Sequence, residues 1–507
     1  WLKRSTLNSV ENADHPVVSG GTDASNYEVV GFWNSTDDVI INSTSTGSRN
    51  TNTTQVFRDL SSWYHLVVQR NDANQVIYIN GVAVNTISSA SSSDSYINKS
   101  GHTMTVGCHV PSLNTVCFDG YLADVVFVDG TAVSISSLGE TIGGVWVAKD
   151  PSGLTFGNNG YYLKFADDSA LGTDSAGNGS FGTNGVAASD VVPDSPNRNF
   201  ATMNPLMVGG ANTQVHASAT YAEGNLKVLA GGYSTSTVGG GFSSIAIPSD
   251  KKIYVEVCET NSTEFGAGVL IQDHVQNNTQ MSGNGSVTYY NRSVIVNGTE
   301  TDYGSSAGAG GLGVARLAAG DVLGIAVDGA TGKVWFHRNG TYFKSPSTNN
   351  SGTTGNPSAG SNEIGTVTNT TAINPSGNLF FFLTGNSSTD NLFINFGQDS
   401  TFAGNKDVGS ETDANGEGLF LYAVPTDYVC LHSGNMSDPA IGPAQSSQSD
   451  DHFDTLLYTG NSGTLEVNGL NFQPDFLWIK RRDSAQNFSH GLLNSVTGIR
   501  KGLYSHR

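Results

Sequence analysis

Charged residues are scarce in this 507-residue chain, where they make up 13% of the sequence, against about 25% in an average globular protein. Basic residues are scarcest: 24 Lys and Arg stand against 44 Asp and Glu, for a formal net charge of −20. Such an acidic surface repels nucleic-acid phosphates and anionic lipids. We therefore expect no nucleic-acid partner and no membrane partner, and the basic run at 480–482 is expected to be a solvated turn.

Long apolar runs, prolines and cysteines are also few. No run approaches the roughly 18 apolar residues of a membrane helix, and the chain holds only 14 Pro and 4 Cys. Four cysteines without CxxC spacing exclude a disulfide-rich scaffold and a cysteine-based zinc site. Cys108 and Cys117 end two apolar runs that a loop could bring together. They either form a disulfide or remain buried thiols.

Helical periodicity is missing too, whereas strand signals are frequent. Residues 63–84, WYHLVVQRNDANQVIYINGVAV, contain two apolar runs around a polar turn and end in an Asn-Gly pair. Residues 320–343, GDVLGIAVDGATGKVWFHRNGTYF, follow the same plan. Asn-Gly supplies the positive φ angles of a tight hairpin, and β-branched and aromatic residues favour strands. The chain is predicted to be all-β, with tandem antiparallel sandwiches.

The spacing of strand candidates predicts the domain organisation. We expect a first sandwich at 1–173, a linker at 174–203 and a second sandwich at 204–402. A connecting segment at 403–448 would precede a third β module at 449–507. The sequence pattern indicates that this module is cut short, so the chain is expected to be part of a longer polypeptide.

Two segments resemble known families. WYHLVVQRNDANQVIYINGV followed by FDGYLADVVFVDG resembles laminin-G-like, concanavalin A-like jelly rolls. GDVLGIAVDGATGKVWFHRNG, ending in LFINFGQ, resembles a SPRY (B30.2-like) domain, which is also a concanavalin-type sandwich. The resemblances imply sandwiches that bind ligands.

The order of segments carries a further resemblance. FDGYLADVVFVDGTAV, LGETIGGVWVAKD, GYYLKFADDSALGTDSAGNG and SPNRNFATMNPL, with FDTLLYTGNSGTLEVNGLNFQPDFLWIKRR near the end, are similar to tail-fibre and related virion structural proteins of tailed, particularly marine, bacteriophages. This resemblance implies a virion-surface location, other virion proteins as partners, and a homo-oligomer, although the sequence shows no heptad repeat.

Catalytic patterns are not found. Glycoside hydrolysis needs paired carboxylates, yet Glu363 has no acidic neighbour, and Glu256 and Glu259 fall on opposite faces of one strand. His65 and His337 lie inside hairpin strands, where a structural role is expected. No GxSxG elbow or P-loop occurs. We expect no enzymatic activity.

Binding groups are expected in loops. Loops at 276–290 and 341–374 are rich in Ser, Asn, Gly and Tyr, a composition like that of antibody paratopes; the alternative is that they are solvent-filled connections or subunit contacts. The expected aromatic anchors are Tyr289, Tyr290, Tyr303 and Tyr342. No cofactor is expected. Because laminin-G-like sandwiches sometimes hold calcium in rim loops, the candidate oxygen donors are Asp37, Asp38, Asp119, Asp129, Asp167 and Asp168.

These observations predict a non-enzymatic virion-surface protein, a tail-fibre or appendage segment whose loops recognise a host-surface glycan or protein. Two alternatives remain. One is a capsid-associated or decoration protein that binds other virion proteins. The other is a secreted glycoprotein or carbohydrate-active protein, for which Asn-X-Ser/Thr sequons such as Asn34 and Asn42 would be glycosylated.

Overall fold

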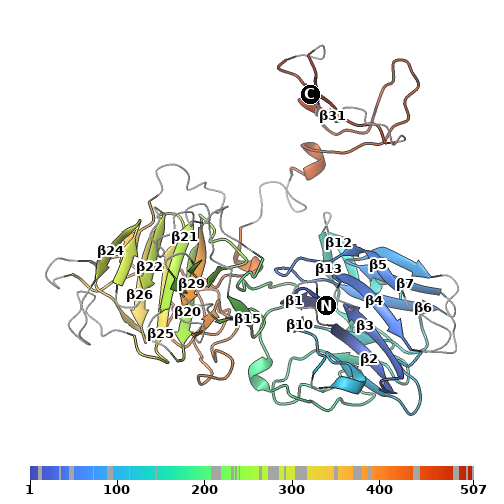
Figure 1. Cartoon of the computed structure of the whole chain (residues 1–507), viewed down its shortest axis with the longest axis horizontal. Helices are drawn as coiled ribbons and strands as arrows, with labels where there is room; N and C mark the ends of the chain where they lie inside the picture. The colour runs from blue at the N-terminus through green and yellow to red at the C-terminus, as the bar shows by residue number, and fades with distance from the viewer. Residues whose placement is uncertain are drawn as a thin grey trace. The chain divides into compact units, whose positions relative to one another are not determined.

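A computed structural model gives the structure of the chain (Figure 1). The described residues are 1–8, 14–32, 36–44, 51–71, 74–87, 95–113, 115–142, 145–206, 219–229, 233–234, 237–238, 240–261, 265–271, 285–290, 293–302, 317–346, 352–368, 379–385, 390–437, 446–482, 490–497 and 501–504. The contacts divide the chain into two compact units. The first is Trp1–Glu140 with Val147–Met436, and the second is Thr141–Trp146 with Ser437–Arg507.

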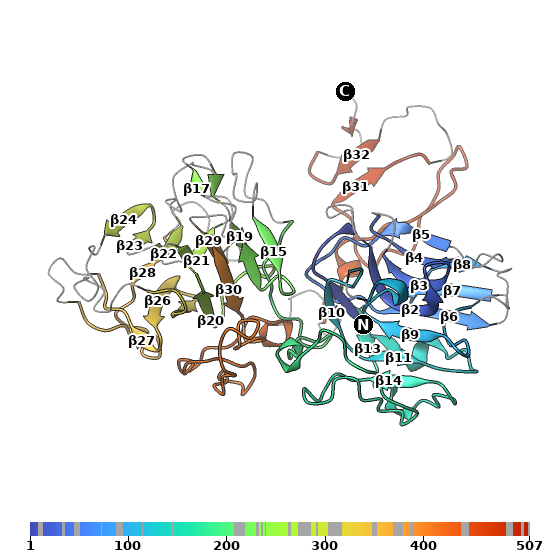
Figure 2. The same ribbon diagram turned by 60° about the horizontal axis from the view of Figure 1, so that its bottom comes forward.

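The predicted all-β class is confirmed. The sheets of the first sandwich are antiparallel, and Figure 2 shows β6, β7 and β8 side by side. One sheet contains β5 (Thr51–Val56), β4 (Asp38–Ser43), β3 (Asn26–Phe32), β2 (His15–Asp23) and β9 (Thr103–Val106), and a second contains β6 (Leu66–Asn71), β7 (Asn74–Ile79) and β8 (Val82–Ile87). Two short pairs join β1 (Leu2–Arg4) with β10 (Gly120–Leu122) and β11 (Val125–Phe127) with β14 (Tyr161–Leu163). A further pair joins β12 (Gly139–Ile142) with β13 (Val145–Ala148), and Thr141–Trp146 of this pair belong to the second unit.

Alternation of apolar residues explains the core of this sandwich. In a strand every second side chain faces the same side. Val30 and Phe32 of β3 pack against Val39 and Ile41 of β4, and the core continues to Ile77 on β7. All five are less than a tenth exposed. The two sheets therefore enclose a common apolar layer.

The second sandwich has two larger antiparallel sheets. One has the order β15 (Thr220–Ala222), β16 (Lys227–Leu229), β30 (Asn391–Asn395), β20 (Lys252–Glu259), β25 (Val322–Asp328), β26 (Lys333–Arg338) and β27 (Thr341–Tyr342), with β28 (Gly365–Thr366) beside β26. The other has the order β19 (Gly240–Phe242), β29 (Leu379–Gly385), β21 (Phe265–Ile271), β22 (Ser286–Tyr290), β23 (Ser293–Val296) and β24 (Thr299–Asp302). A short pair joins β17 (Tyr233–Ser234) and β18 (Thr237–Val238).

Both predicted hairpins are present in the structure. Strand β6 pairs with β7 from Leu66 opposite Ile79 to Asn71 opposite Asn74, and β25 pairs with β26. Asn80 and Gly81 have φ values of 49° and 78°. Two successive positive φ angles are the geometry of the tight hairpin turn that Asn-Gly favours.

The segments between the sandwiches differ from the expectation of simple connections. Asp194, in the expected linker 174–203, is buried and bonds to Lys3 on β1. Within the expected connecting segment 403–448, Phe420 and Tyr428 are completely buried against the second sandwich. The local sequence pattern did not predict the burial of these segments, because that burial depends on partners far away in the chain.

The second unit contains a small sheet of β31 (Phe476–Ile479), β32 (Gly491–Asn494) and β33 (Leu503–Tyr504). The short 3-10 helices of the chain are η1 (Val110–Ser112), η2 (Ile135–Ser137), η3 (Pro151–Gly153), η4 (Ala188–Asp190), η6 (Ser433–Asn435) and η7 (Ser449–Asp451). Among the described residues, no helix has the length and apolar character needed to span a membrane.

Candidate functional site

A cavity of about 630 Å³ lies in the first sandwich between β6 and β11. Its volume falls within the roughly 300 to 1,000 Å³ of ligand pockets. We call it the β6–β11 cavity, and its two long walls are residues 65–71 and 124–133. The remaining lining residues include Leu2, Val17, Val30, Ile97, Leu122 and Tyr161. Polar and charged residues also line it, among them Arg70, Ser95, Asn98, Asp124 and Lys149, so the lining is mixed.

The walls consist of strand edges. Strand β6 is the outer strand of the β6–β7–β8 sheet, and β11 pairs only with β14 among the described strands. Consecutive residues of both segments line the cavity, although successive side chains of a strand point to opposite faces. A cavity that touches every residue in turn lies beside the strand's edge, where its backbone is reached from the side.

Polar side chains around the β6–β11 cavity already have protein partners. The Arg70 guanidinium contacts Glu28, and Arg70 Nη1 donates to Ser95 Oγ at 2.7 Å. Ser95 Oγ in turn donates to Glu28 Oε2 at 2.7 Å, and the Tyr96 amide donates to the same oxygen at 3.0 Å. The buried Glu28 therefore holds residues 95–96 against β3.

The opposite rim is arranged similarly. Gln69 Nε2 donates to the carbonyl of Val133 at 2.7 Å, and Asn98 Nδ2 donates to Asp129 Oδ1 at 2.9 Å. Each of these bonds fixes a loop at the rim. These polar groups therefore help to hold the fold around the cavity.

His65 directly precedes β6 and has the structural role that was expected of it. Its ring stacks on Trp1 with a centroid distance of 4.5 Å. Burial lowers the pKa of His65 to about 3, so the ring is neutral at pH 7.

The aspartates considered for calcium do not converge. Asp37 accepts from Arg58 Nε at 2.7 Å, Asp38 from Asn52 Nδ2 at 2.7 Å, and Asp129 from Asn98. The backbone carbonyl of Asp119 accepts a hydrogen bond from the Ser5 amide. The Asp167 carboxylate accepts one from the Ser169 amide, and Asp168 is exposed. Within the described ranges, no group of three or more His, Cys, Asp or Glu could hold a metal ion. Calcium binding stays a prediction.

The prediction that the candidate tyrosines lie in loops is wrong for the three that the structure describes. Tyr289 and Tyr290 lie in β22. Tyr289 pairs with Ala267 of β21, which turns its ring into the core, where it is 1% exposed. Tyr342 lies in β27, half-buried, with its ring 5.1 Å from that of His337. Tyr303 lies outside the described residues.

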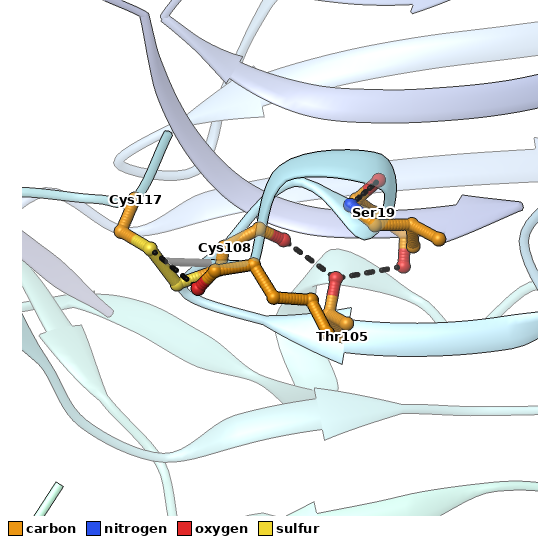
Figure 3. Close-up of a disulfide and its surroundings, with 6 residues drawn as sticks. Ser19, Thr105, Cys108 and Cys117 are labelled. Atoms are coloured by element: carbon orange, nitrogen blue, oxygen red, sulfur yellow. Dashed lines mark hydrogen bonds between the residues drawn. A yellow bond between two sulfur atoms is a disulfide. The ribbon is translucent and has the colours of Figure 1, made fainter. Parts of the chain in front are cut away.

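Cys108 and Cys117 form a disulfide (Figure 3). Figure 3 places Thr105 between Cys108 and Ser19: Thr105 Oγ1 donates to the Cys108 carbonyl at 2.5 Å and lies 3.4 Å from the Ser19 carbonyl. The loop that the bond closes is therefore attached to β2. The other two cysteines, Cys258 and Cys430, are buried free thiols.

Removing this disulfide by Cys108→Ser with Cys117→Ser is expected to lower the free energy of unfolding by about 2 to 3 kcal/mol. A bond across nine positions restricts the unfolded chain by roughly that amount in the chain-entropy view. Urea denaturation of the oxidised native protein and of the double serine variant measures this difference in unfolding free energy. Reducing agent should destabilise the native protein equally and leave the double variant unchanged; equal stability of all samples would contradict the prediction.

The second sandwich contains a buried polar chain. His337 Nδ1 accepts from the Gly340 amide at 3.1 Å, so Nε2 carries the hydrogen and donates to Tyr254 Oη at 2.7 Å. Tyr254 Oη donates to Glu256 Oε1 at 3.1 Å. The Glu256 carboxylate also accepts the amides of Leu421 and Tyr422 at 3.0 and 2.9 Å. This chain attaches residues 421–422 to β20.

The stability of the second sandwich should depend on the protonation of Glu256. Burial raises the pKa of Glu256 from 4.5 to about 7. The folded state then binds this proton more tightly than the unfolded state, so stability should fall as pH rises from about 4.5 to 7. The expected loss is about 3 kcal/mol at 1.4 kcal/mol per pKa unit.

Denaturation with urea at several pH values tests this expectation. In Glu256→Gln, which cannot titrate, the contribution of this group to the pH dependence should vanish. The stability of the native protein relative to this variant should therefore fall by about 3 kcal/mol between pH 4.5 and 7. Parallel pH profiles of the two proteins would show that Glu256 does not titrate in that range.

Sequence analysis missed the β6–β11 cavity. Residues 66–70 were interpreted as one strand of a hairpin, and residues 124–128 were considered only as part of the segment that resembles laminin-G-like jelly rolls. One signal was available: LVV at 66–68 and VVFV at 125–128 are apolar at consecutive positions, which indicates a strand contacted on both faces. The pattern could not show that both strands leave an edge open.

Comparisons with known proteins support the first domain. Residues 1–134 match a laminin G family described as the concanavalin A-like lectin/glucanases superfamily, which confirms that part of the resemblance. Residues 448–507 match a domain family of unknown function, DUF7483. A search of curated proteins finds no match.

Two solved structures are similar to parts of the chain. The SPRY domain of human HERC1 has 14% identity and a TM-score of 0.22, and the match covers 33% of this chain and 87% of that one. The TRIM65 PSpry domain has 10% identity and a TM-score of 0.25, with coverage of 38% and 91%. The description of the second sandwich therefore rests on its own sheets and register.

Proposed function

We propose that this chain is a non-enzymatic binding protein of a virion surface, a tail-fibre or appendage segment of a tailed bacteriophage that recognises a host-surface glycan or protein. The observation that carries the proposal is the match of residues 1–134 to a superfamily that includes lectins. The order of segments along the chain, which is similar to that of tail-fibre proteins, supports the virion location.

The use of the buried carboxylates supports binding over catalysis. A glycosidase needs two carboxyl groups that reach the substrate. Here Glu28 holds residues 95–96, Glu256 holds residues 421–422, and Asp194 bonds to Lys3. These acidic groups serve the fold.

A glycan array with the purified full chain tests the proposal. Binding of a defined set of bacterial surface glycans, abolished by the free saccharide, is expected. Incubation with the bound glycan should release no reducing sugar, and such release would favour the carbohydrate-active alternative. An array without signal, together with absence of adsorption to host cells, would contradict host recognition.

A capsid-associated or decoration protein is the second candidate function. The second unit favours it, because several large apolar side chains are exposed there, including Phe453 at 74%, Leu457 at 78% and Trp478 at 65%. Exposed apolar surface that forms a contiguous patch is typical of protein contacts. Co-purification with other virion proteins, without adsorption to cells, would support this candidate.

A further inference from the structure

We propose that Lys3 and Asn199 react to form an intramolecular isopeptide bond, with Asp194 as the proton acceptor and ammonia as the leaving group. The bond joins β1 covalently to the segment that enters the second sandwich. This inference goes beyond the proposed function, because it concerns a covalent modification of the chain and needs no ligand. It rests on the contacts of the Lys3 amine, on its burial and on the turn that aligns the other two groups.

The Lys3 amine is completely enclosed. Lys3 is 0% exposed, and lysine is almost never fully buried unless it is paired. Its Nζ donates to Asn199 Oδ1 at 2.7 Å, to Asp194 Oδ2 at 2.9 Å and to the Phe200 carbonyl at 2.8 Å. These acceptors use all the donors of the ammonium group. The amine is therefore held at one place, next to a carboxamide and a carboxylate.

Aromatic rings keep this contact dry. The Tyr121 ring centroid lies 5.5 Å from Lys3 Nζ, and Trp63 Nε1 donates to Asp194 Oδ1 at 3.0 Å. Trp63 and Asp194 are both less than a tenth exposed. Burial lowers the pKa of Lys3, and the adjacent Asp194 opposes that shift. Transfer of one proton from Nζ to Asp194 removes two buried charges at once. It also makes the amine a nucleophile.

A tight turn places Asp194 and Asn199 beside each other. Ser195 and Arg198 exchange two backbone hydrogen bonds, at 3.2 and 3.0 Å. The Asn199 carboxamide is also held from its other end, because its Nδ2 donates to the Ser61 carbonyl at 2.7 Å. The reacting groups are thus oriented before any reaction, which removes much of the entropic cost of bringing them together.

The reaction balances without any other reactant. Asp194 accepts one proton from Lys3, and the uncharged Nζ attacks Cγ of Asn199. A bond forms between Nζ and Cγ, and the bond between Cγ and Nδ2 breaks. Nζ passes a second proton to Nδ2, which leaves as ammonia, while Asp194 keeps the first proton. Asn199 is partly exposed, so the ammonia can reach solvent. The structure shows the groups before this reaction, as an ion pair.

Asn199 is the better of the two carbonyl groups for this attack. An ionised carboxylate resists attack at its carbon. Asp194 Oδ1 also accepts hydrogen bonds from Trp63 Nε1 at 3.0 Å and from the Phe200 amide at 3.2 Å. These bonds orient Asp194 as the proton acceptor and leave the neutral carboxamide of Asn199 as the group that is attacked.

The bond would close the first sandwich into a loop. Lys3 and Asn199 lie on either side of all the strands from β2 to β14. A force that pulls on the two ends of the chain would therefore pass through the bond, and unfolding of the first sandwich would not lengthen the chain. Such a link suits a protein that carries a mechanical load.

The intact mass of the purified full chain, after reduction of the disulfide, tests this proposal. The native protein should be lighter than its sequence by the mass of one ammonia. Trypsin should release a branched peptide that joins Trp1–Arg4 to residues 199–227, because trypsin does not cleave after an acylated lysine. A full sequence mass together with cleavage after Lys3 would overturn the proposal.

Three variants assign the roles. Lys3→Arg keeps the positive charge but lacks the amine, so it should have its full sequence mass. In Asn199→Asp the bond can form only with loss of water, and continued loss of ammonia would overturn the assignment to Asn199. In Asp194→Asn the rate of cross-linking in freshly synthesised protein should fall about a hundredfold or more, and an unchanged rate would overturn the role of Asp194. Circular dichroism confirms folding, and the branched peptide of the native chain remains decisive where a variant does not fold.

The branched peptide also separates the competing products. Loss of water with a branch at Asp194 would overturn Asn199 as the acceptor. Loss of ammonia without a branch, the result of cyclisation at an Asn-Gly pair, would overturn the bond itself. Lys149 is the internal control, because its Nζ lies 3.2 Å from Glu140 Oε2 while the two side chains are 38% and 50% exposed. Water solvates that pair, so no branched peptide should include Lys149.

Discussion

Replacing Trp335 by alanine is expected to lower the free energy of unfolding by about 3 to 5 kcal/mol, the usual cost of a large aromatic cavity. Trp335 is completely buried on β26, and its Nε1 donates to the Ser361 carbonyl at 2.9 Å. The ring packs in a cluster with Phe200, Phe420 and Tyr428. Urea denaturation followed by circular dichroism measures the change.

Trp478→Ala is the matched control for this experiment. Trp478 is also on a strand, but it is 65% exposed in the second unit. Its truncation should cost less than about 1 kcal/mol, as for other surface positions. If both variants lost a similar amount of unfolding free energy, Trp335 would not be a core residue. The position of β26 in the second sandwich would then be wrong.

Local signals were sufficient to predict the hairpins. Trp63 and Trp335, which lie in the two predicted hairpin segments, are 8% and 0% exposed. The alternating apolar residues and the Asn-Gly pairs at 80–81 and 339–340 act over a few residues. Such short-range signals can be recognised in the sequence without any knowledge of the tertiary fold.

The position of Tyr289 could not be predicted in the same way. Its neighbours are rich in Gly, Ser and Asn, which favour loops. Its ring faces inward because β22 pairs with β21, so that Tyr289 lies opposite Ala267 and packs near Phe265 and Phe343. Those partners are distant in the sequence, and the local pattern carries no information about their register.

The packing of residues 403–436 and the β6–β11 cavity were missed for a related reason. Phe420 and Tyr428 lie in a segment with few alternating residues, and bonds from the buried Glu256 hold it in place. The cavity lies beside β6 and β11, which are both edge strands. Which strand becomes an edge depends on the pairing of all the others, which single-segment patterns do not encode.

The segment 194–200 leads to the second large expected effect. Lys3 on β1 is buried, and its Nζ donates to Asp194 Oδ2 at 2.9 Å, to Asn199 Oδ1 at 2.7 Å and to the Phe200 carbonyl at 2.8 Å. Asp194 Oδ1 also accepts from Trp63 Nε1 at 3.0 Å. One ammonium group thus joins β1 to the segment that enters the second sandwich.

Lys3→Met is expected to lower the free energy of unfolding by about 3 to 5 kcal/mol, because it leaves the Asp194 carboxylate buried without its cation. Burial lowers the pKa of Lys3, and the adjacent Asp194 opposes that shift. Adding Asp194→Asn removes the unpaired charge while it keeps an oxygen for Trp63. This double variant should therefore recover part of the loss, which a double-mutant cycle in urea quantifies.

Lys149→Met provides the comparison for Lys3→Met. It shows whether the buried Lys3–Asp194 ion pair contributes more to stability than an exposed ion pair does. Lys149 and Glu140 are 3.2 Å apart, with side chains 38% and 50% exposed, so water screens them and the loss should be less than about 1 kcal/mol. If Lys3→Met costs no more than Lys149→Met, or if the double variant is less stable than Lys3→Met alone, then segment 194–200 is held by packing around Phe200, and the buried charges contribute little.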